Sequence, residues 1–373
     1  MKINDKTKKL KVAIVHYWLD SYRGGERVIE SVCELFPNAD IYTHIYKPEN
    51  LPETITKHNV FATFISKLPF ARKFYRHYLL LMPFALLALN LKKYDLIISS
   101  ESGPAKGVRK RKDALHICYC HSPMRYIWDM KQDYTQTKGA VFKLLWEVVA
   151  CYMRFWDRRS VKSVDQFIAN SKFISARIKK FYNRKATVIN PPVDVDKFNA
   201  NQDRDDFYLC ASQLVPYKKV DLVVKAFNEL GLPLVVIGTG TEFDKIKAIA
   251  KPNIKLLGKV SDNILKDKFE KCKAFVYGGK EDFGIVLVEA LAAGAPVIAY
   301  GRGGAAEIVE ENKSGLFFRE QTSESIIEAV KKFELEKEKL LIPLEISEHA
   351  KKFAKKYFKQ KIANFIEEKL NNK

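Results

Sequence analysis

The 373-residue sequence has no long apolar run. Its longest, Leu79 to Leu89, is interrupted by Pro83 and is shorter than the roughly 20 residues that span a bilayer. The N-terminal stretch MKINDKTKKLKVAIV carries charges but lacks an apolar segment of signal-peptide length. These absences argue against a membrane-spanning helix and a signal peptide. They predict a protein that is soluble or rests on one face of a membrane.

Cysteine is also scarce, with six residues scattered along the chain. Most of them lie in apolar stretches, which predicts reduced core residues of a cytosolic protein. Cys118, Cys120 and His121 form a C-x-C-H pattern, but no second pair of ligands follows at zinc-site spacing. The pattern therefore favours a structural role for these cysteines over a metal site.

Acidic residues are few in the first half of the chain. Residues 1–200 carry 35 Lys and Arg against 18 Asp and Glu, a net charge of +17, whereas residues 201–373 carry only +3 of the total of +20. Such a basic half is expected to face nucleic acid, anionic lipid or a phosphorylated acceptor. Because no nucleic-acid-binding motif accompanies the charge, we favour an anionic membrane surface and expect no nucleic acid partner.

The complete G-x-G-x-x-G fingerprint of dinucleotide sites is missing as well. Gly24 and Gly25 follow a strand predicted at Lys11–Val15, and a second glycine turn, G-T-G, begins at Gly238. Both are turns in which the backbone can approach a phosphate, although each could equally be an ordinary connection between a strand and a helix. The second turn has no acidic residue at the distance expected for ribose, so a dehydrogenase is a poor interpretation.

What the sequence does contain is an alternation of short apolar strands and helical patterns, which is typical of parallel α/β folds. At 373 residues and 47% hydrophobic composition, the chain is long enough for two domains with separate cores. The segment NPPVDVDKF, residues 190–198, predicts a linker between them that is stiff at its two prolines.

The most informative stretch is KEDFGIVLVEALAAGAPVIAYGRGGAAEIV, residues 280–309. Gly284 is expected to open a helix over Ile285–Ala293, with Glu281 ahead of it and Glu289 about one turn inside. The free amides at the start of the helix could bind a phosphate while the two carboxylates accept hydrogen bonds from hydroxyls, which suits a nucleotide sugar. A buried amphipathic helix with an acidic residue at its N-terminus is the alternative.

Together with GAPVIA and GRGGAAEIV, this stretch resembles the signature of the family 4 (group 1) retaining glycosyltransferases of the GT-B fold. The resemblance covers nearly the whole chain and is strongest over residues 206–318. The segments SSESGPAKGV, at 99–108, and CYCHSPMRYIWD, at 118–129, are most similar to bacterial mannosyltransferases that build O-antigen and related polysaccharides.

The resemblance implies an α/β architecture of two Rossmann-like, doubly wound parallel-sheet domains that face each other across a cleft. The expected segments are a basic, acceptor-side domain at 1–190, a linker at 191–200, a donor-nucleotide-binding domain at 201–345 and, at 346–373, a C-terminal helix that crosses back to the first domain.

It further implies a retaining hexosyltransferase that moves mannose from GDP-mannose onto a lipid-linked or membrane-bound saccharide in cell-surface polysaccharide or lipopolysaccharide biosynthesis. The protein would be cytoplasmic and peripheral on the inner membrane. A UDP-sugar donor is an alternative within the same fold. A non-enzymatic, basic membrane- or RNA-binding protein on a transferase scaffold is an alternative from another class.

Site residues follow from the resemblance position by position. Glu281 would orient the transferred sugar and His121, which follows a predicted strand, would contact it, so these two are the catalytic candidates. Glu289 would accept hydrogen bonds from the ribose. The other donor-binding candidates are Gly24, Gly25, Gln213, Lys218, Lys219, Asp262, Phe283, Gly284 and Ile285. Gln213 departs from the family, which usually has an arginine there, and a neutral amide cannot neutralise a diphosphate.

No metal or other cofactor is expected besides the nucleotide-sugar donor. Asp194 and Asp196 form a D-x-D pair, a pattern that holds a metal in other transferases, but the pair lies in the proline-containing linker. In the resembling family, lysine and helix amides neutralise the diphosphate instead. Asp262 could accept hydrogen bonds from guanine, although capping a helix is the commoner use of such a residue.

Residues 60–93 combine Phe, Leu and Tyr with Lys and Arg and contain no acidic residue. A basic amphipathic segment of this kind can lie in a lipid interface, and we predict a membrane-docking segment here. The alternative is a helix pair packed on the domain core, and both can hold, one face each. Residues 140–162 form a second aromatic and basic helical stretch.

Overall fold

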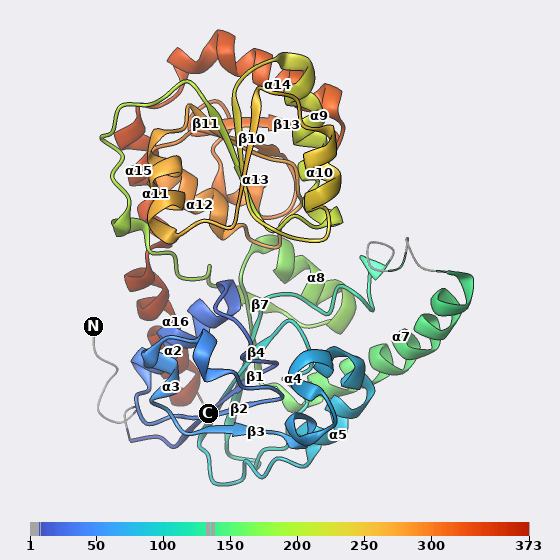
Figure 1. Ribbon diagram of the computed structural model, residues 1–373. Helices are drawn as coiled ribbons and strands as arrows, with labels where there is room; N and C mark the ends of the chain where they lie inside the picture. Colours follow the sequence, from blue (N-terminus) through green and yellow to red (C-terminus); the bar gives the residue numbers. More distant parts are fainter. Residues whose placement is uncertain (1–6, 8, 132–134, 136–138, 373) are drawn as a thin grey trace. The chain divides into compact units, whose positions relative to one another are not determined.

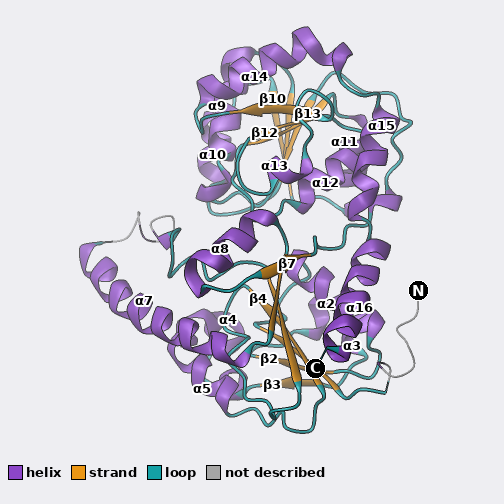
Figure 2. Ribbon diagram, turned by 180° about the vertical axis from the view of Figure 1, so that it is seen from behind, coloured by secondary structure: helices purple, strands orange, loops and turns teal. Residues whose placement is uncertain are grey.

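The structure, a computed structural model, describes residues 7, 9–131, 135 and 139–372. The chain divides into unit 1, residues 1–192 and 356–373, and unit 2, residues 193–355. Each unit has one parallel sheet between layers of helices (Figures 1 and 2), so the predicted class of two Rossmann-like, doubly wound α/β domains is confirmed. Among the described residues, no helix is both long enough and apolar enough to cross a membrane.

In the described part of unit 1, the parallel sheet has the order β3-β2-β1-β4-β5-β6-β7. The strands are β1 (Val12–His16), β2 (Asp40–Thr43), β3 (Val60–Ala62), β4 (Leu96–Glu101), β5 (Leu115–Cys120), β6 (Gln166–Ala169) and β7 (Ala186–Val188). The three central strands β1, β4 and β5 are buried along their whole length, because helices cover both faces of the sheet.

The helices of unit 1 are α2 (Gly24–Leu35), α3 (Glu53–Thr56), α4 (Ala71–Phe74), α5 (Met82–Leu87), α7 (Ala140–Ser160), α8 (Lys172–Tyr182) and α16 (Lys355–Asn371). Successive residues of β1 point to opposite faces. Ile14 therefore packs in a core with α2 and α16, while Val15 packs in another with α5 and α7.

Two strands and the shape of residues 60–93 differ from the sequence prediction. Strands β2 and β3, which are only four and three residues long, were not predicted from the sequence. Residues 60–93 begin with β3 and continue as the 3-10 turns η2 (Phe64–Lys67) and η3 (Tyr75–Leu81) with α4 and α5, so the alternative of a regular pair of helices is wrong. Pro69 and Pro83 interrupt any longer helix here because proline lacks the amide hydrogen.

A buried charge cluster fixes the C-terminal half of α7 to β4. Lys106, which is fully buried, forms ion pairs with both Glu101 and Asp157. Asp157 also accepts hydrogen bonds from Trp128 Nε1 at 2.8 Å and from the hydroxyl of Tyr182 at 2.9 Å. Burial alone would lower the pKa of Lys106, but the two carboxylates outweigh it and raise that pKa, so the lysine stays charged.

In unit 2 the parallel sheet has the order β10-β9-β8-β11-β12-β13. Its strands are β8 (Tyr208–Ala211), β9 (Leu234–Ile237), β10 (Ile254–Gly258), β11 (Ala274–Tyr277), β12 (Val297–Tyr300) and β13 (Gly315–Phe318). Its helices are α9 (Val220–Leu230), α10 (Phe243–Ile249), α11 (Asp262–Lys271), α12 (Ile285–Ala292), α13 (Ala305–Ile308), α14 (Ser323–Glu336) and α15 (Pro343–Ala350).

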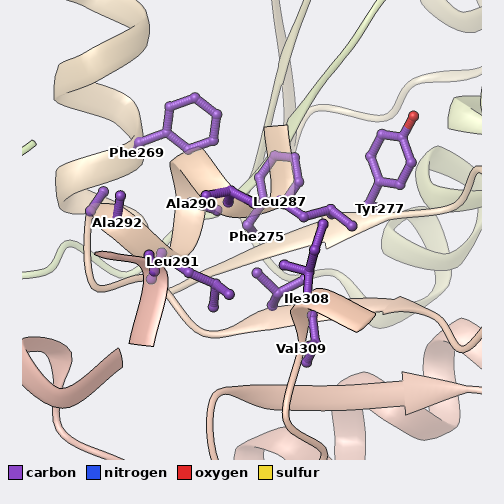
Figure 3. Close-up of a cluster of buried hydrophobic side chains, with 14 of the residues drawn as sticks. Phe269, Phe275, Tyr277, Leu287, Ala290, Leu291, Ala292, Ile308 and Val309 are labelled. Atoms are coloured by element: carbon purple, nitrogen blue, oxygen red, sulfur yellow. The ribbon is translucent and has the colours of Figure 1, made fainter. Parts of the chain in front are cut away.

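Helix α12 confirms the prediction for residues 284–293. Gly284 precedes it with φ +105° and Gly294 follows it with φ +74°, values that glycine adopts readily and other residues do not. Figure 3 shows Leu287 and Leu291 of this helix packed in a core with Phe275, while the hydroxyl of Tyr277 points away from the cluster. Truncating either leucine to alanine would cost about 2–5 kcal/mol.

The C-terminal segment is two helices, where a single helix was predicted at 346–373. The 3-10 turn η8 (Lys351–Phe353) separates α15, which packs in unit 2, from α16, which packs in unit 1. The break is fixed by Val193, whose amide donates to the carbonyl of Phe353 at 3.1 Å and whose carbonyl accepts from the amide of Lys355 at 3.2 Å. The two places where the chain passes between the units are therefore adjacent.

Candidate functional site

In unit 2 the strand order reverses between the neighbouring strands β8 and β11. The chain runs from β8 outward to β9 and β10, then returns to β11 and runs to β12 and β13 on the other side. Ligands of open α/β sheets bind outside the carboxyl ends of the strands at such a point. Helices α9 and α12 follow these two strands, so their positive N-terminal ends lie at the same edge.

The loops after β8 and β11 lie in direct contact. A side-chain carbon placed on Gly278 would lie 2.7 Å from the carbonyl oxygen of Lys219, and one on Gly279 would lie 3.1 Å from Cα of Lys218. Only glycine allows this approach. Lys219 itself has φ +54°, a left-handed conformation that is uncommon for lysine.

Glu281 is the centre of the side-chain contacts in this region. Its carboxylate forms an ion pair with Lys218 and accepts a hydrogen bond from the hydroxyl of Tyr277. Burial, followed by the charge of Glu281, raises the pKa of Tyr277 well above its ordinary value, so the phenol remains a donor. The structure thus brings together the predicted catalytic carboxylate and the predicted phosphate-binding lysine, which are 63 positions apart in the sequence.

The loop after β12 contacts the backbone of Glu281 and Phe283. The amide of Gly304 donates to the carbonyl of Glu281 at 2.9 Å. A side-chain carbon on Gly304 would lie 1.8 Å from the carbonyl oxygen of Phe283, so only glycine fits at this position. The GRGG segment therefore fixes the backbone that carries Glu281.

Glu289 lies in the second turn of α12, as predicted, and is buried. Its Oε1 lies 3.5 Å from Nζ of Lys197, an ion pair that the sequence analysis missed. Lys197 belongs to the 3-10 turn η5 (Val195–Lys197), which also contains Asp196. No local signal links Lys197 to Glu289, because 92 positions separate them.

The remaining unit 2 candidates differ in their surroundings. Gln213 is exposed after β8, and Asp262 is exposed as the first residue of α11, where Ser261 supplies the cap by accepting from the amide of Ile264 at 3.4 Å. Ile285 is the first residue of α12. Phe283 is buried, with its ring 5.5 Å from that of Phe353, so a role at the site would fall to its backbone.

In unit 1 a polar network lies at the carboxyl ends of β1, β4 and β5. His16 contacts Ser100 Oγ through Nδ1 at 3.0 Å and Glu26 Oε1 through Nε2 at 3.3 Å. The same Ser100 Oγ lies 2.8 Å from Nε2 of His121. A side-chain carbon on Gly25 would lie 3.7 Å from that Nε2, so the predicted glycine turn and the predicted histidine are neighbours.

Burial, with a smaller contribution from His16, lowers the pKa of His121 to about 3, so its ring is neutral at physiological pH. Three residues of this network, His16, Ser100 and Glu26, were not among the candidates predicted from the sequence. Two of them could have been found, because His16 directly follows the strand predicted at Lys11–Val15, and Ser100 lies just after the apolar run Leu96–Ile98.

Metal ligands are not grouped in the described part of the chain, where no three His, Cys, Asp or Glu side chains lie close enough to hold an ion. Asp194 and Asp196 are both exposed. Cys118 and Cys120 are free and buried in β5, and burial raises the pKa of each thiol. Cys151, on α7, is exposed, which differs from the prediction of core cysteines.

Family comparisons cover both units. Residues 22–197 match the family model described as Glycosyltransferase Family 4, and residues 194–357 match the model described as Glycosyl transferases group 1.

Two curated relatives are similar to part of the chain. An uncharacterized glycosyltransferase of Methanocaldococcus jannaschii is 29% identical over 213 residues, which are 55% of this chain and 58% of that protein. The GDP-mannose-dependent alpha-(1-6)-phosphatidylinositol monomannoside mannosyltransferase of Mycobacterium tuberculosis is 27% identical over 205 residues, 46% of this chain and 53% of that protein. The matched region thus spans little more than half the length of these relatives.

Among solved structures, HepE of Anabaena in complex with UDP-glucose is similar with a TM-score of 0.66 and 15% identity, over 96% of this chain and 100% of that one. This likeness shows the fold alone, and it agrees with the two-unit architecture described above.

Proposed function

We propose that the chain is a retaining hexosyltransferase of the family 4 (group 1) glycosyltransferases with the GT-B fold, a proposal supported by the matches of two family models to residues 22–197 and 194–357. The observation that carries the proposal is the contact set of Glu281, which joins Lys218, Tyr277 and the amide of Gly304 at the strand-order reversal of unit 2. This arrangement offers one carboxylate, one cation and the N-terminal end of a helix to a single ligand.

The diphosphate of a nucleotide sugar fits this combination. Lys218 and the first amides of α12, at Gly284 and Ile285, would bind the diphosphate and stabilise the negative charge that develops as it leaves. Lys219 would add a second cation and offset the absence of an arginine at Gln213. With these groups neutralising the charge, we propose that transfer needs no metal.

The other residues would hold the two ends of the donor. Glu281 would accept hydrogen bonds from hydroxyls of the transferred sugar, and Glu289 from the ribose. Asp262 would face the base. From unit 1, we assign His121 a contact with the sugar, and Gly24 and Gly25 an approach to the diphosphate.

In the proposed reaction, the bond between the anomeric carbon and the donor phosphate breaks while a bond to the acceptor oxygen forms on the same face of the sugar. The acceptor hydroxyl gives its proton to the leaving phosphate oxygen. The protein supplies orientation and charge stabilisation and forms no covalent bond to the sugar.

We propose GDP-mannose as the donor and a lipid-linked or membrane-bound saccharide of a cell-surface polysaccharide or lipopolysaccharide as the acceptor. The resemblance of residues 99–129 to polysaccharide mannosyltransferases supports this, as does the name of the mycobacterial relative. A UDP-sugar is the second candidate donor, which the UDP-glucose complex of HepE favours. The basic residues of unit 1 support work on an anionic surface, at the cytoplasmic face of the inner membrane.

The donor is tested by calorimetry with GDP-mannose, UDP-glucose and UDP-N-acetylglucosamine. Binding of the first alone supports the proposal, and binding of a UDP-sugar alone supports the alternative. If none of the three binds, the non-enzymatic interpretation replaces it.

The catalytic role is tested with Glu281→Ala, which is expected to lower transfer of radiolabelled sugar to membrane extracts at least about a hundredfold. Its matched control is Glu328→Ala, at an exposed position of α14, which should leave transfer unchanged. An unaltered rate in a folded Glu281→Ala variant would remove this residue from the mechanism.

A further inference from the structure

Helix α7 carries a stripe of large apolar side chains that the rest of unit 1 leaves exposed. Five of its members are 62–73% exposed: Val141, Leu144, Leu145, Val148 and Phe155. They recur every three or four residues on one face of the helix, over about 21 Å at 1.5 Å per residue. Large contiguous apolar patches on a protein surface mark sites that bind proteins, membranes or ligands.

A basic pocket of about 790 Å³ lies beside the C-terminal half of this helix. Six of the residues that line it are Arg154, Arg158, Arg159, Lys162, Trp128 and Phe181. The rings of Trp128 and Phe181 stack at 4.7 Å and form an apolar wall, and the guanidinium of Arg158 lies 4.9 Å from the Trp128 ring. Phe155 of the apolar stripe also lines the pocket, so the two features are continuous.

The positive charge of this pocket is only partly neutralised. Arg154 pairs with Glu147 at 2.6 Å, and the one carboxylate in the lining, Asp129, is held by Arg177 at 2.5 Å. Within the described ranges, Arg158, Arg159 and Lys162 form no ion pair with a carboxylate. Three cations next to aromatic rings are therefore available to an anionic ligand.

Residues 60–93, which pack beside α7, expose apolar side chains as well. Met82 of α5 packs in the same core as Met153 and Trp156 of α7, and Figures 1 and 2 both show α4 and α5 beside α7. Phe70, in the turn before α4, is 81% exposed, and Phe84 of α5 is 57% exposed. Two separate stretches of the chain thus present apolar side chains and lysines or arginines on one part of unit 1.

We propose that this part of unit 1 docks onto a bilayer of anionic phospholipid, with the α7 stripe among the acyl chains and the pocket around a lipid phosphate. An apolar row bordered by cations matches the boundary between acyl chains and anionic headgroups. A second copy of the chain fits less well, because docking on this face would bring two strongly basic surfaces together. The inference rests on the proposed function and deepens it. It names the class of lipid at whose surface the enzyme would bind a membrane-bound acceptor.

The charge part of the proposal is tested by flotation of the full chain with vesicles, without nucleotide sugar. We expect binding to phosphatidylcholine vesicles that contain phosphatidylglycerol and none to phosphatidylcholine alone. The triple variant Arg158→Ala, Arg159→Ala, Lys162→Ala should bind about a hundredfold more weakly, since each cation near an anionic surface contributes roughly fivefold.

A matched control removes three exposed lysines outside α7: Lys331→Ala, Lys356→Ala and Lys361→Ala. It should change vesicle binding by less than about threefold. Equal losses in the two triple variants would mean that overall charge, and not the pocket, attracts the chain, and would overturn the proposal.

The apolar part is tested with Leu145→Gln and Val148→Gln together, which should weaken vesicle binding at least about tenfold because both side chains leave the lipid. Leu335→Gln with Leu344→Gln is the control, since these residues of unit 2 are 85% and 55% exposed.

Two outcomes would identify a different ligand for this surface. If the stripe variant binds vesicles normally but dissociates a dimer in light scattering, the surface binds a second copy of the chain. If calorimetry detects inorganic phosphate in the pocket while vesicles do not bind, the ligand is a soluble phosphate. Either result would overturn the proposal.

Donor binding, measured on the same preparations, separates the two hypotheses. Normal nucleotide-sugar binding without vesicle binding would overturn this inference and leave the proposed function standing. Vesicle binding without any nucleotide-sugar binding would do the reverse.

Discussion

Replacing Lys106 by methionine tests whether the buried charge cluster holds α7 in place. Lys106 is fully buried between Glu101 and Asp157, and methionine fills a similar volume without the charge. Removing one partner of a buried ion pair leaves the other uncompensated and costs about 3–5 kcal/mol. We expect the free energy of unfolding of unit 1 to fall by this amount at pH 8.

The loss should depend on pH in a defined direction. Burial, opposed by Lys106, raises the pKa of Glu101 from 4.5 to about 7. A carboxyl with a raised folded pKa contributes stability that is fully present below pH 4.5 and is lost as the pH rises through 7. Without Lys106 that pKa rises further, so the variant should be less impaired at pH 5.5 than at pH 8.

Tryptophan fluorescence during urea unfolding measures this directly, because all four tryptophans, Trp18, Trp128, Trp146 and Trp156, belong to unit 1. Lys110→Met is the control. Lys110 pairs with Asp165 at 3.1 Å in a partly exposed position, so its loss should cost no more than about 1 kcal/mol. The reasoning is refuted if both variants unfold within 1 kcal/mol of the unchanged protein at both pH values.

Three further predictions concern the candidate site. Tyr277→Phe removes a hydrogen bond to the Glu281 carboxylate, and kcat for transfer should fall at least about tenfold with little change in Tm; an unchanged kcat would make the bond irrelevant to turnover. Gly304→Ala brings a methyl group against the carbonyl of Phe283 and should destabilise unit 2 by at least about 2 kcal/mol in far-ultraviolet circular dichroism, whereas normal stability would show that the loop can move aside. Burial lowers the pKa of His121 from 6.5 to about 3, so the free energy of unfolding should fall as the pH falls from 6.5 toward 3. In urea titrations, His121→Gln should reduce this loss. The same pH dependence in the variant would contradict the assignment of the loss to His121.

The sheet of unit 2 could be predicted from the sequence because most of its strands are short apolar runs. YLCA of β8 and AFVY of β11 are buried at every position, as central parallel strands must be. Both ends of α12 could also be predicted, since Gly284 and Gly294 flank a run of residues that favour helix. In unit 1, β2 and β3 could not be predicted, because four residues or fewer cannot establish the alternation of apolar and polar residues that marks a strand.

The side-chain partners could not be predicted, since they depend on which strands are neighbours. Glu281 meets Lys218 only because β8 and β11 are adjacent, and the sequence alone does not state the strand order. The resemblance made Phe283 a donor-binding candidate, but an aromatic ring at the end of a loop can equally turn into the core, as it does against Phe353. Local pattern fixes backbone position better than side-chain direction.

The hydrogen bonds of Val193 with Phe353 and Lys355 have a practical consequence for protein engineering. They place the two ends of unit 2 beside each other, so this unit is one uninterrupted length of chain with neighbouring termini. Segments of that kind can be excised, produced alone or grafted into a related scaffold, because joining their ends requires little new loop. Under the proposed function, exchanging residues 193–355 between relatives would therefore transfer the preference for the donor nucleotide in one piece.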